Sequence, residues 1–159
     1  MLSRKGRDIS YLARAVIRDV AVLPVRECIL DGELIAVGSD GRPNFEAMGS
    51  RRHPHCLCAF DLLWIDGEDL RPLPLAERQR QLAALLRVVS PCLHAVDGFD
   101  DPIRLLKAAA EHGLEGIVSK RLDAPYRSGN RSGWTKVKTP RWQAANQRRL
   151  EAIRNSFRR

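Results

Sequence analysis

Two carboxylates interrupt an apolar stretch, and this stretch constrains the fold more than any other part of the sequence. Residues 29–37 read ILDGELIAV, a pattern typical of a β-strand, and Asp31 and Glu33 fall in its middle. Burying an ionised carboxylate is costly unless it meets a metal, a cation or several hydrogen-bond donors. We therefore predict a strand in which Glu33 serves binding or catalysis rather than packing.

Strand and helix patterns alternate along the rest of the chain. Strands are expected at residues 28–37, 56–65, 93–96, 116–120 and 134–138. Helices are expected at residues 12–20, 45–48, 75–86 and 102–112, with a final basic helix or tail over 140–159. The length of 159 residues predicts a single core.

The helix after residue 101 has the clearest limits. Asp101 is a favourable N-cap, Pro102 suits the first helical position and Gly113 stands just beyond the end. In the preceding helix, the spacing of the leucines places Glu77, Arg78 and Arg80 on the polar face.

The positive charge is concentrated near the C-terminus. Residues 1–114 hold 15 Lys and Arg against 16 Asp and Glu, whereas residues 115–159 hold 12 against 3. Such a one-sided surface attracts polyanions, with nucleic acid or nucleotide phosphate as the first candidate; a solvated basic tail is the alternative for the last twenty residues. No apolar run is long enough to cross a bilayer, so a cytoplasmic protein without a membrane partner is expected.

A second carboxylate and two lysines suggest a phosphate and metal site. Glu115 directly follows a predicted helix, and both Glu115 and Glu33 have a glycine neighbour that would let a ligand approach the backbone. Lys136 and Lys138 alternate along one strand, so both point to the same side and could hold a triphosphate. Taken singly, these features also fit a solvated edge strand or a mobile loop.

Six short motifs follow one another between residues 3 and 138. They are SRKGRD at 3–8, LDGE at 30–33, AFDLL at 59–63, LPLAER at 73–78, EGIVSKR at 115–121, and YRSG at 126–129 leading to WTKVK at 134–138. In this order they resemble the adenylation domain of ATP-dependent DNA ligases, most closely the bacterial end-joining ligase D type. The resemblance implies an α+β fold, with antiparallel sheets flanked by helices, of the nucleotidyltransferase (ATP-grasp-like) type.

The resemblance also implies a role for individual residues in nucleotide binding and catalysis. Glu33 would contact the ribose and the metal region, and Phe60 would stack on adenine. Glu115 would bind the metal, either magnesium or manganese, which take similar oxygen ligands. Lys136 and Lys138 would hold the phosphates of ATP, and these two lysines together with both glutamates form the expected catalytic set.

Broken or nicked double-stranded DNA is the second substrate that the resemblance implies. Arg4 matches an arginine that meets phosphate at the nick, and Arg127 and Arg131 add two guanidinium groups in the loop before residue 134. Such enzymes transfer AMP from ATP to a lysine, then to the 5′-phosphate of DNA, and finally seal the break with the 3′-hydroxyl.

One motif of that family is absent from this sequence. The adenylated lysine lies in a K-x-D-G motif, and no K-x-D-G occurs here; the five lysines are Lys5, Lys107, Lys120, Lys136 and Lys138. We therefore expect residues 1–139 to form a partial adenylation domain, truncated at the N-terminus and lacking the oligonucleotide-binding domain, with residues 140–159 as a basic extension.

Two functions remain open at this point. The chain could belong to a nucleoid-associated ligase of DNA repair and recombination, either as a truncated or mis-started form of a product that has the lysine motif or as half of a split enzyme, with a separate chain supplying that motif. Alternatively, it could be a non-catalytic remnant that binds ATP or nicked DNA.

Overall fold

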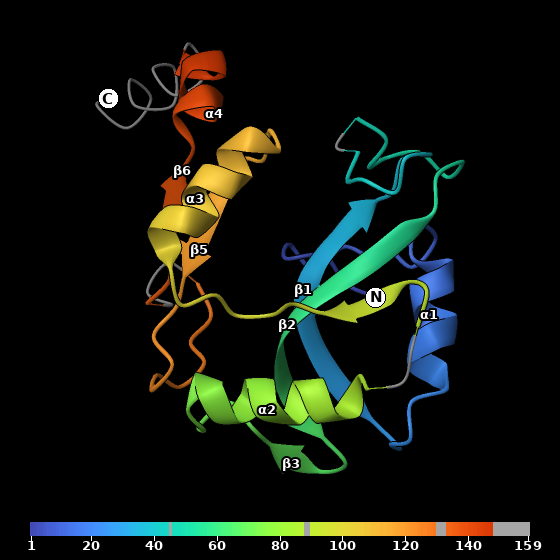
Figure 1. The fold of residues 1–159 in the computed structure, drawn as a ribbon. Helices are drawn as coiled ribbons and strands as arrows, with labels where there is room; N and C mark the ends of the chain where they lie inside the picture. The colour runs from blue at the N-terminus through green and yellow to red at the C-terminus, as the bar shows by residue number, and fades with distance from the viewer. Residues whose placement is uncertain (45, 88–89, 130–132, 148–159) are drawn as a thin grey trace, which may run out of the picture. The chain divides into compact units, whose positions relative to one another are not determined.

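The computed structural model describes residues 1–44, 46–87, 90–129 and 133–147, and its backbone forms two compact units (Figure 1). The first unit contains Met1–Asp97 and Leu122–Tyr126, and the second contains Gly98–Arg121 and Arg127–Arg159. The backbone therefore passes between the units three times, after Asp97, Arg121 and Tyr126. The buried apolar core described among these residues lies within the first unit.

The first unit is built around the long strand β2 (His55–Ile65). β1 (Cys28–Ala36) pairs with it antiparallel, and β3 (Glu68–Asp69) pairs with its end across a two-residue turn. Asp66 and Gly67 form that turn with φ values of 45° and 95°, the left-handed conformations that a tight hairpin requires. β4 (Leu93–Ala95) lies parallel to β2, and helices α1 (Arg14–Ala21) and α2 (Leu75–Leu85) contact β2 as well (Figure 1).

The core of the first unit gathers apolar side chains from the sheet and from both helices. Its buried members are Ala13, Val16, Leu34, Leu57, Ala59, Leu62, Leu70, Leu82, Leu85 and Leu93. Leu57 and Ala59 are two positions apart on a strand, and Leu82 and Leu85 are three apart on a helix, so each pair shares one face. This burial explains why residues 56–65 are almost continuously apolar.

The second unit contains α3 (Pro102–Glu111), the antiparallel pair β5 (Gly116–Ser119) and β6 (Thr135–Lys138), and α4 (Pro140–Ala145). α3 contacts β5 (Figure 1). The Asp101 side chain accepts a hydrogen bond from the Arg104 backbone at 2.9 Å, which confirms the predicted cap. Thr139 caps α4 in the same way, accepting from the Trp142 backbone at 3.3 Å.

Several local predictions are wrong, each for a tertiary reason. Residues 46–49 form turns rather than a helix, and the short strand β3 was not expected. Arg78 is not on a polar face but is 2% exposed, because it pairs with a carboxylate of β2. The predicted helix within 140–159 begins at Pro140 and is described to Ala145; residues 148–159 lie outside the described part. In the described part of the chain, no helix has the length and apolar character to cross a membrane.

Candidate functional site

Glu33 and Phe60 lie near one another on the central strands of the first unit. Glu33 is the register partner of Cys58, two residues from Phe60, and its side chain is exposed. Burial, and after it the charge of Glu33, raises the pKa of the Cys58 thiol. These two strands thus carry an exposed carboxylate and a half-buried aromatic ring close to one another in the sheet.

A β-bulge displaces Phe60 from the regular ladder. The register passes from Asp31↔Asp61 directly to Gly32↔Ala59, so Phe60 is the extra residue on β2. Bulges bend a strand and redirect a side chain, and they occur often beside functional sites. Here the bulge lies one residue from Glu33 along β1.

Gly32 is needed for the packing of the two strands rather than for a ligand. A Cβ on Gly32 would lie 2.8 Å from the Cys58 carbonyl oxygen and 3.0 Å from the Ala59 Cα. A larger residue would therefore push β1 away from β2. The expectation that this glycine gives a ligand access to the backbone is replaced by a close approach of two strands.

A buried polar cluster in the first unit was missed from the sequence. Arg78 donates to both carboxylate oxygens of Asp61, at 2.7 and 2.9 Å, and Asp61 is fully buried. Tyr126 donates its hydroxyl to Asp31 at 2.9 Å, and its ring centroid lies 5.9 Å from the Arg78 guanidinium. Asp61 did carry a signal, because it is a carboxylate inside an apolar strand, just as Glu33 is.

Arg4 lies at the tip of a small N-terminal hairpin. The Ser3 backbone donates to the Arg7 carbonyl at 2.8 Å, and Leu2 forms a bridge with Asp8, which closes the turn. Arg4 is exposed at this tip, as a residue that meets an external phosphate must be.

In the second unit, the structure brings Glu115 and Lys138 into contact. The Lys138 ammonium forms an ion pair with the Glu115 carboxylate and lies 4.7 Å from the ring centroid of Trp142. Lys138 is the register partner of Gly116, and Lys136 is the partner of Val118. The two lysines are therefore two positions apart on β6, as predicted, and Lys136 is exposed.

The backbone around Glu115 is held by Thr139 and Gly116. Thr139 donates its amide to the Glu115 carbonyl at 2.9 Å and its hydroxyl to the Leu114 carbonyl at 3.0 Å. A Cβ on Gly116 would lie 2.1 Å from the Val137 carbonyl oxygen, so only glycine allows β6 to approach here. These contacts fix Glu115 beside Lys138.

The remaining predicted site residues are less constrained by described contacts. Arg127 is exposed, and Arg131 lies outside the described residues. A further lysine of the second unit makes a cation–π contact, because the Lys120 ammonium lies 3.9 Å from the ring centroid of Trp134, the residue before β6.

The acidic residues fit a weakly held divalent cation better than a protein-built metal cage. Within the described ranges, no cluster of three or more His, Cys, Asp or Glu could hold a metal. Magnesium commonly takes only one or two carboxylates and completes its shell with water and phosphate. Glu33 in the first unit and Glu115 in the second are each exposed, so each by itself offers a single carboxylate of that kind.

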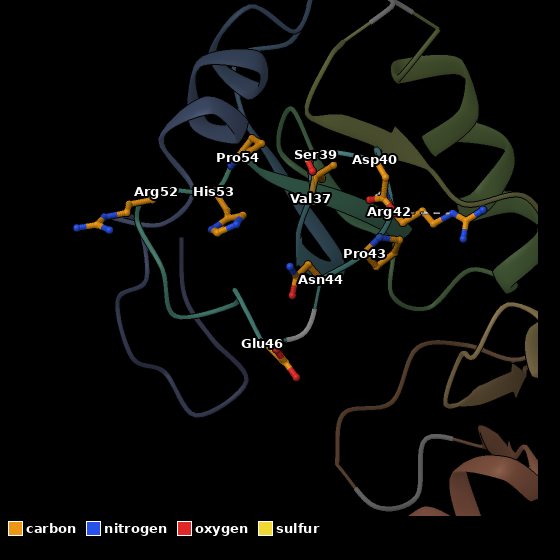
Figure 2. A pocket seen from close by; sticks show the side chains of 11 residues that line it. Val37, Ser39, Asp40, Arg42, Pro43, Asn44, Glu46, Arg52, His53 and Pro54 are labelled. Carbon is orange, nitrogen blue, oxygen red and sulfur yellow. Dashed lines mark hydrogen bonds and ion pairs between the residues drawn. The ribbon is translucent and has the colours of Figure 1, made fainter.

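A cavity of about 840 Å³ lies at the turn that follows β1. Figure 2 shows its lining, which includes Asp40 and Glu46 as well as Arg42 and Arg52. Its charges are mixed, and none of the predicted site residues lines it. This cavity therefore offers no preference for a polyphosphate.

A comparison with known protein families identifies the family of this chain. Residues 1–138 match a family model described as ATP dependent DNA ligase domain. This chain belongs to the ATP-dependent DNA ligase family. Its resemblance to this family, predicted from six motifs, is confirmed.

Relatives and a solved structure support the same assignment. The chain is 36% identical to the multifunctional non-homologous end joining protein LigD of Pseudomonas aeruginosa, over 87% of this chain and 17% of that protein. It is also 36% identical to a probable DNA ligase of Mycobacterium sp. (strain KMS), over 86% of this chain and 30% of the relative. A solved mycobacterial DNA ligase D, complexed with ATP and MES, superposes with a TM-score of 0.71 at 31% identity.

These matches confirm the predicted mixed helix and antiparallel-sheet fold of the nucleotidyltransferase type; β4, which pairs parallel, is the exception within the sheet. The match with the solved mycobacterial structure covers 86% of this chain and 46% of that chain. It spans less than a third of the length of the two curated relatives described above.

Proposed function

We propose that this chain forms the nucleotide-binding and DNA-binding part of an ATP-dependent DNA ligase. The observation that carries the proposal is the contact between Glu115 and Lys138, with Lys136 on the same strand, in a chain of the ligase family. A carboxylate that can hold magnesium stands beside the Lys138 ammonium, and a second lysine that can neutralise phosphate lies on the same strand; phosphoryl-type transfer needs groups of these two kinds.

The groups that the family resemblance assigns to ATP binding lie in both units. In the first unit, Phe60 would stack on adenine and Glu33 would bind the ribose and a metal ion. In the second unit, Lys136 and Lys138 would bind phosphate, and Glu115 would bind magnesium or manganese. The metal would neutralise charge on the phosphates, while the lysines hold the phosphate oxygens in place.

The proposed reaction transfers AMP twice. A lysine amine attacks the α-phosphorus of ATP, forming a P–N bond and releasing pyrophosphate. The 5′-phosphate of DNA then displaces the lysine, and the 3′-hydroxyl finally displaces AMP to close the strand. The P. aeruginosa relative, named for end joining, suggests repair of broken DNA in the bacterial cytoplasm, at the nucleoid, as the setting.

Lys136→Ala is expected to weaken binding of magnesium–ATP by about 10- to 100-fold, because a hydrogen bond to a charged group contributes about 1.5–3 kcal/mol. Lys107→Ala is the matched control, since Lys107 is exposed on α3 of the same unit. Titration calorimetry measures both dissociation constants. Equal affinity of the two variants would contradict a phosphate-binding role for Lys136.

The first of the three chemical steps is expected to fail in this chain alone. The sequence contains no K-x-D-G motif, so incubation with α-labelled ATP and magnesium should leave no label on the denatured chain. Retained label that disappears in Lys5→Ala would overturn this expectation and identify Lys5 as the nucleophile. A separate chain that carries the lysine motif is the partner we propose for this step.

The missing lysine motif also favours a second candidate function, a non-catalytic remnant that binds ATP or nicked DNA. Sealing of a nicked duplex that is already adenylated separates the candidates, because that substrate bypasses the lysine. Sealing by this chain, lost in Glu115→Ala, would support the ligase. Binding of ATP and DNA without sealing, with or without a chain that supplies the motif, would support the remnant.

A further inference from the structure

One short segment of the chain returns to the first unit between two parts of the second. Residues 122–126 are held there by three backbone hydrogen bonds. Ala76 donates to the Leu122 carbonyl at 2.9 Å, Leu75 donates to the Ala124 carbonyl at 3.0 Å, and the Tyr126 amide donates to the Arg71 carbonyl at 2.8 Å. The segment thus lies against the beginning of α2.

Hydrogen bonds that involve side chains also hold this segment in place, including its last residue, Tyr126. The Tyr126 hydroxyl donates to Asp31 on β1 at 2.9 Å, and Arg78 donates to the Ala124 carbonyl at 3.3 Å while it holds Asp61. Asp31 and Asp61 are register partners on β1 and β2, so two carboxylates lie side by side in the sheet. Arg78 balances one of them, and the Tyr126 hydroxyl satisfies the other.

The hydroxyl keeps its proton in ordinary buffers. Burial and the neighbouring Asp31 raise the pKa of Tyr126 to about 12. Tyr126 is therefore a permanent donor to Asp31 at physiological pH. The next residue, Arg127, is exposed and begins the following part of the second unit.

We propose that Tyr126 is a positioning residue for Arg127, and that its hydrogen bond to Asp31 fixes the backbone from which the Arg127 guanidinium reaches a phosphate of nicked DNA. This inference rests on the proposed DNA-binding function. Tyr126 itself does not touch the DNA in this account. It acts by limiting the directions that its neighbour can take, which reduces the entropy lost on binding.

A double-mutant cycle on the full chain tests the proposal. Binding of a fluorescent nicked duplex is measured by anisotropy at several salt concentrations for the unsubstituted protein, Tyr126→Phe, Arg127→Ala and the double variant. Arg127→Ala is expected to weaken binding about 10-fold and to lower the slope of log affinity against log salt by about one.

Tyr126→Phe removes no charge, yet it is expected to weaken binding about 3- to 5-fold and to lower the same slope in part, because Arg127 is then less often engaged. The double variant should bind no more weakly than Arg127→Ala alone. A purely structural tyrosine would leave the salt slope unchanged.

Tyr11→Phe is the matched control, because the chain has two tyrosines and the Tyr11 ring contacts Arg51 without a described hydrogen bond from its hydroxyl. It should bind DNA as the unsubstituted protein does. If Tyr126→Phe fails to fold, Asp31→Ala removes the same hydrogen bond from the other side and should give the same loss of slope.

Additive effects of the two substitutions, or an unchanged salt slope in both Tyr126→Phe and Asp31→Ala, would overturn the positioning role while leaving Arg127 as a DNA contact. Full affinity in Arg127→Ala would overturn both roles. Failure of the unsubstituted protein to bind nicked DNA would instead reject the DNA-binding function itself, and the inference with it.

Discussion

Arg78→Met is expected to lower the free energy of unfolding of the first unit by about 3–5 kcal/mol. The substitution removes the partner of Asp61, whose side chain is completely buried, and so leaves a carboxylate without its cation in the interior. It also removes the hydrogen bond to the Ala124 carbonyl. Urea denaturation followed by circular dichroism measures the loss.

Arg80→Met is the matched control for this prediction. Arg80 is on the same helix and pairs with Glu77 at the surface, where solvent screens the ion pair and leaves it little effect on stability. The double variant Asp61→Leu with Arg78→Met should recover most of the lost stability, because it removes the unpaired charge as well. Similar losses in Arg78→Met and Arg80→Met would contradict the importance of the buried pair.

Gly116→Ala is expected to destabilise the second unit by about 3 kcal/mol or more, because the added methyl group meets backbone atoms that cannot move independently. The new Cβ would lie 2.1 Å from the Val137 carbonyl oxygen and 2.8 Å from the Lys138 Cα. Separating β5 from β6 would also part Glu115 from Lys138. Binding of magnesium–ATP should therefore weaken more than it does in Lys136→Ala.

Gly98→Ala provides the comparison for this glycine. Gly98 also belongs to the second unit, but a Cβ there would meet nothing within 4 Å. Thermal unfolding and the dissociation constant of magnesium–ATP should both stay close to those of the unsubstituted protein. A Gly116→Ala variant that behaves like Gly98→Ala would show that the β5–β6 approach is not needed for stability or binding.

Most helices and strands were predictable because their signals are local. The cap at Asp101, the proline after it and Gly113 set the limits of α3 without any tertiary information. The apolar run at residues 56–65 likewise predicted the position of β2 from the sequence alone. Lys136 and Lys138 both lie on β6, so the alternation of residues along this short strand was enough to predict that they share one face.

What the sequence could not show depends on partners far along the chain. Arg78 looks like a surface residue of an amphipathic helix, and only the position of Asp61, 17 residues earlier, explains its burial. The bulge at Phe60 depends on the register between two strands, which no local pattern sets. Tyr126 and Asp31 are 95 residues apart, so their hydrogen bond appears only in the folded chain.

The three crossings of the backbone between the two units have a practical consequence for dissection of this protein. Neither unit is one continuous piece of sequence, so no single truncation or separate expression of two halves yields either unit intact. A protease that cuts at one crossing leaves the units joined by the other two. Limited digestion of the native protein should therefore give separate fragments on a denaturing gel, while the mass measured under native conditions stays the same.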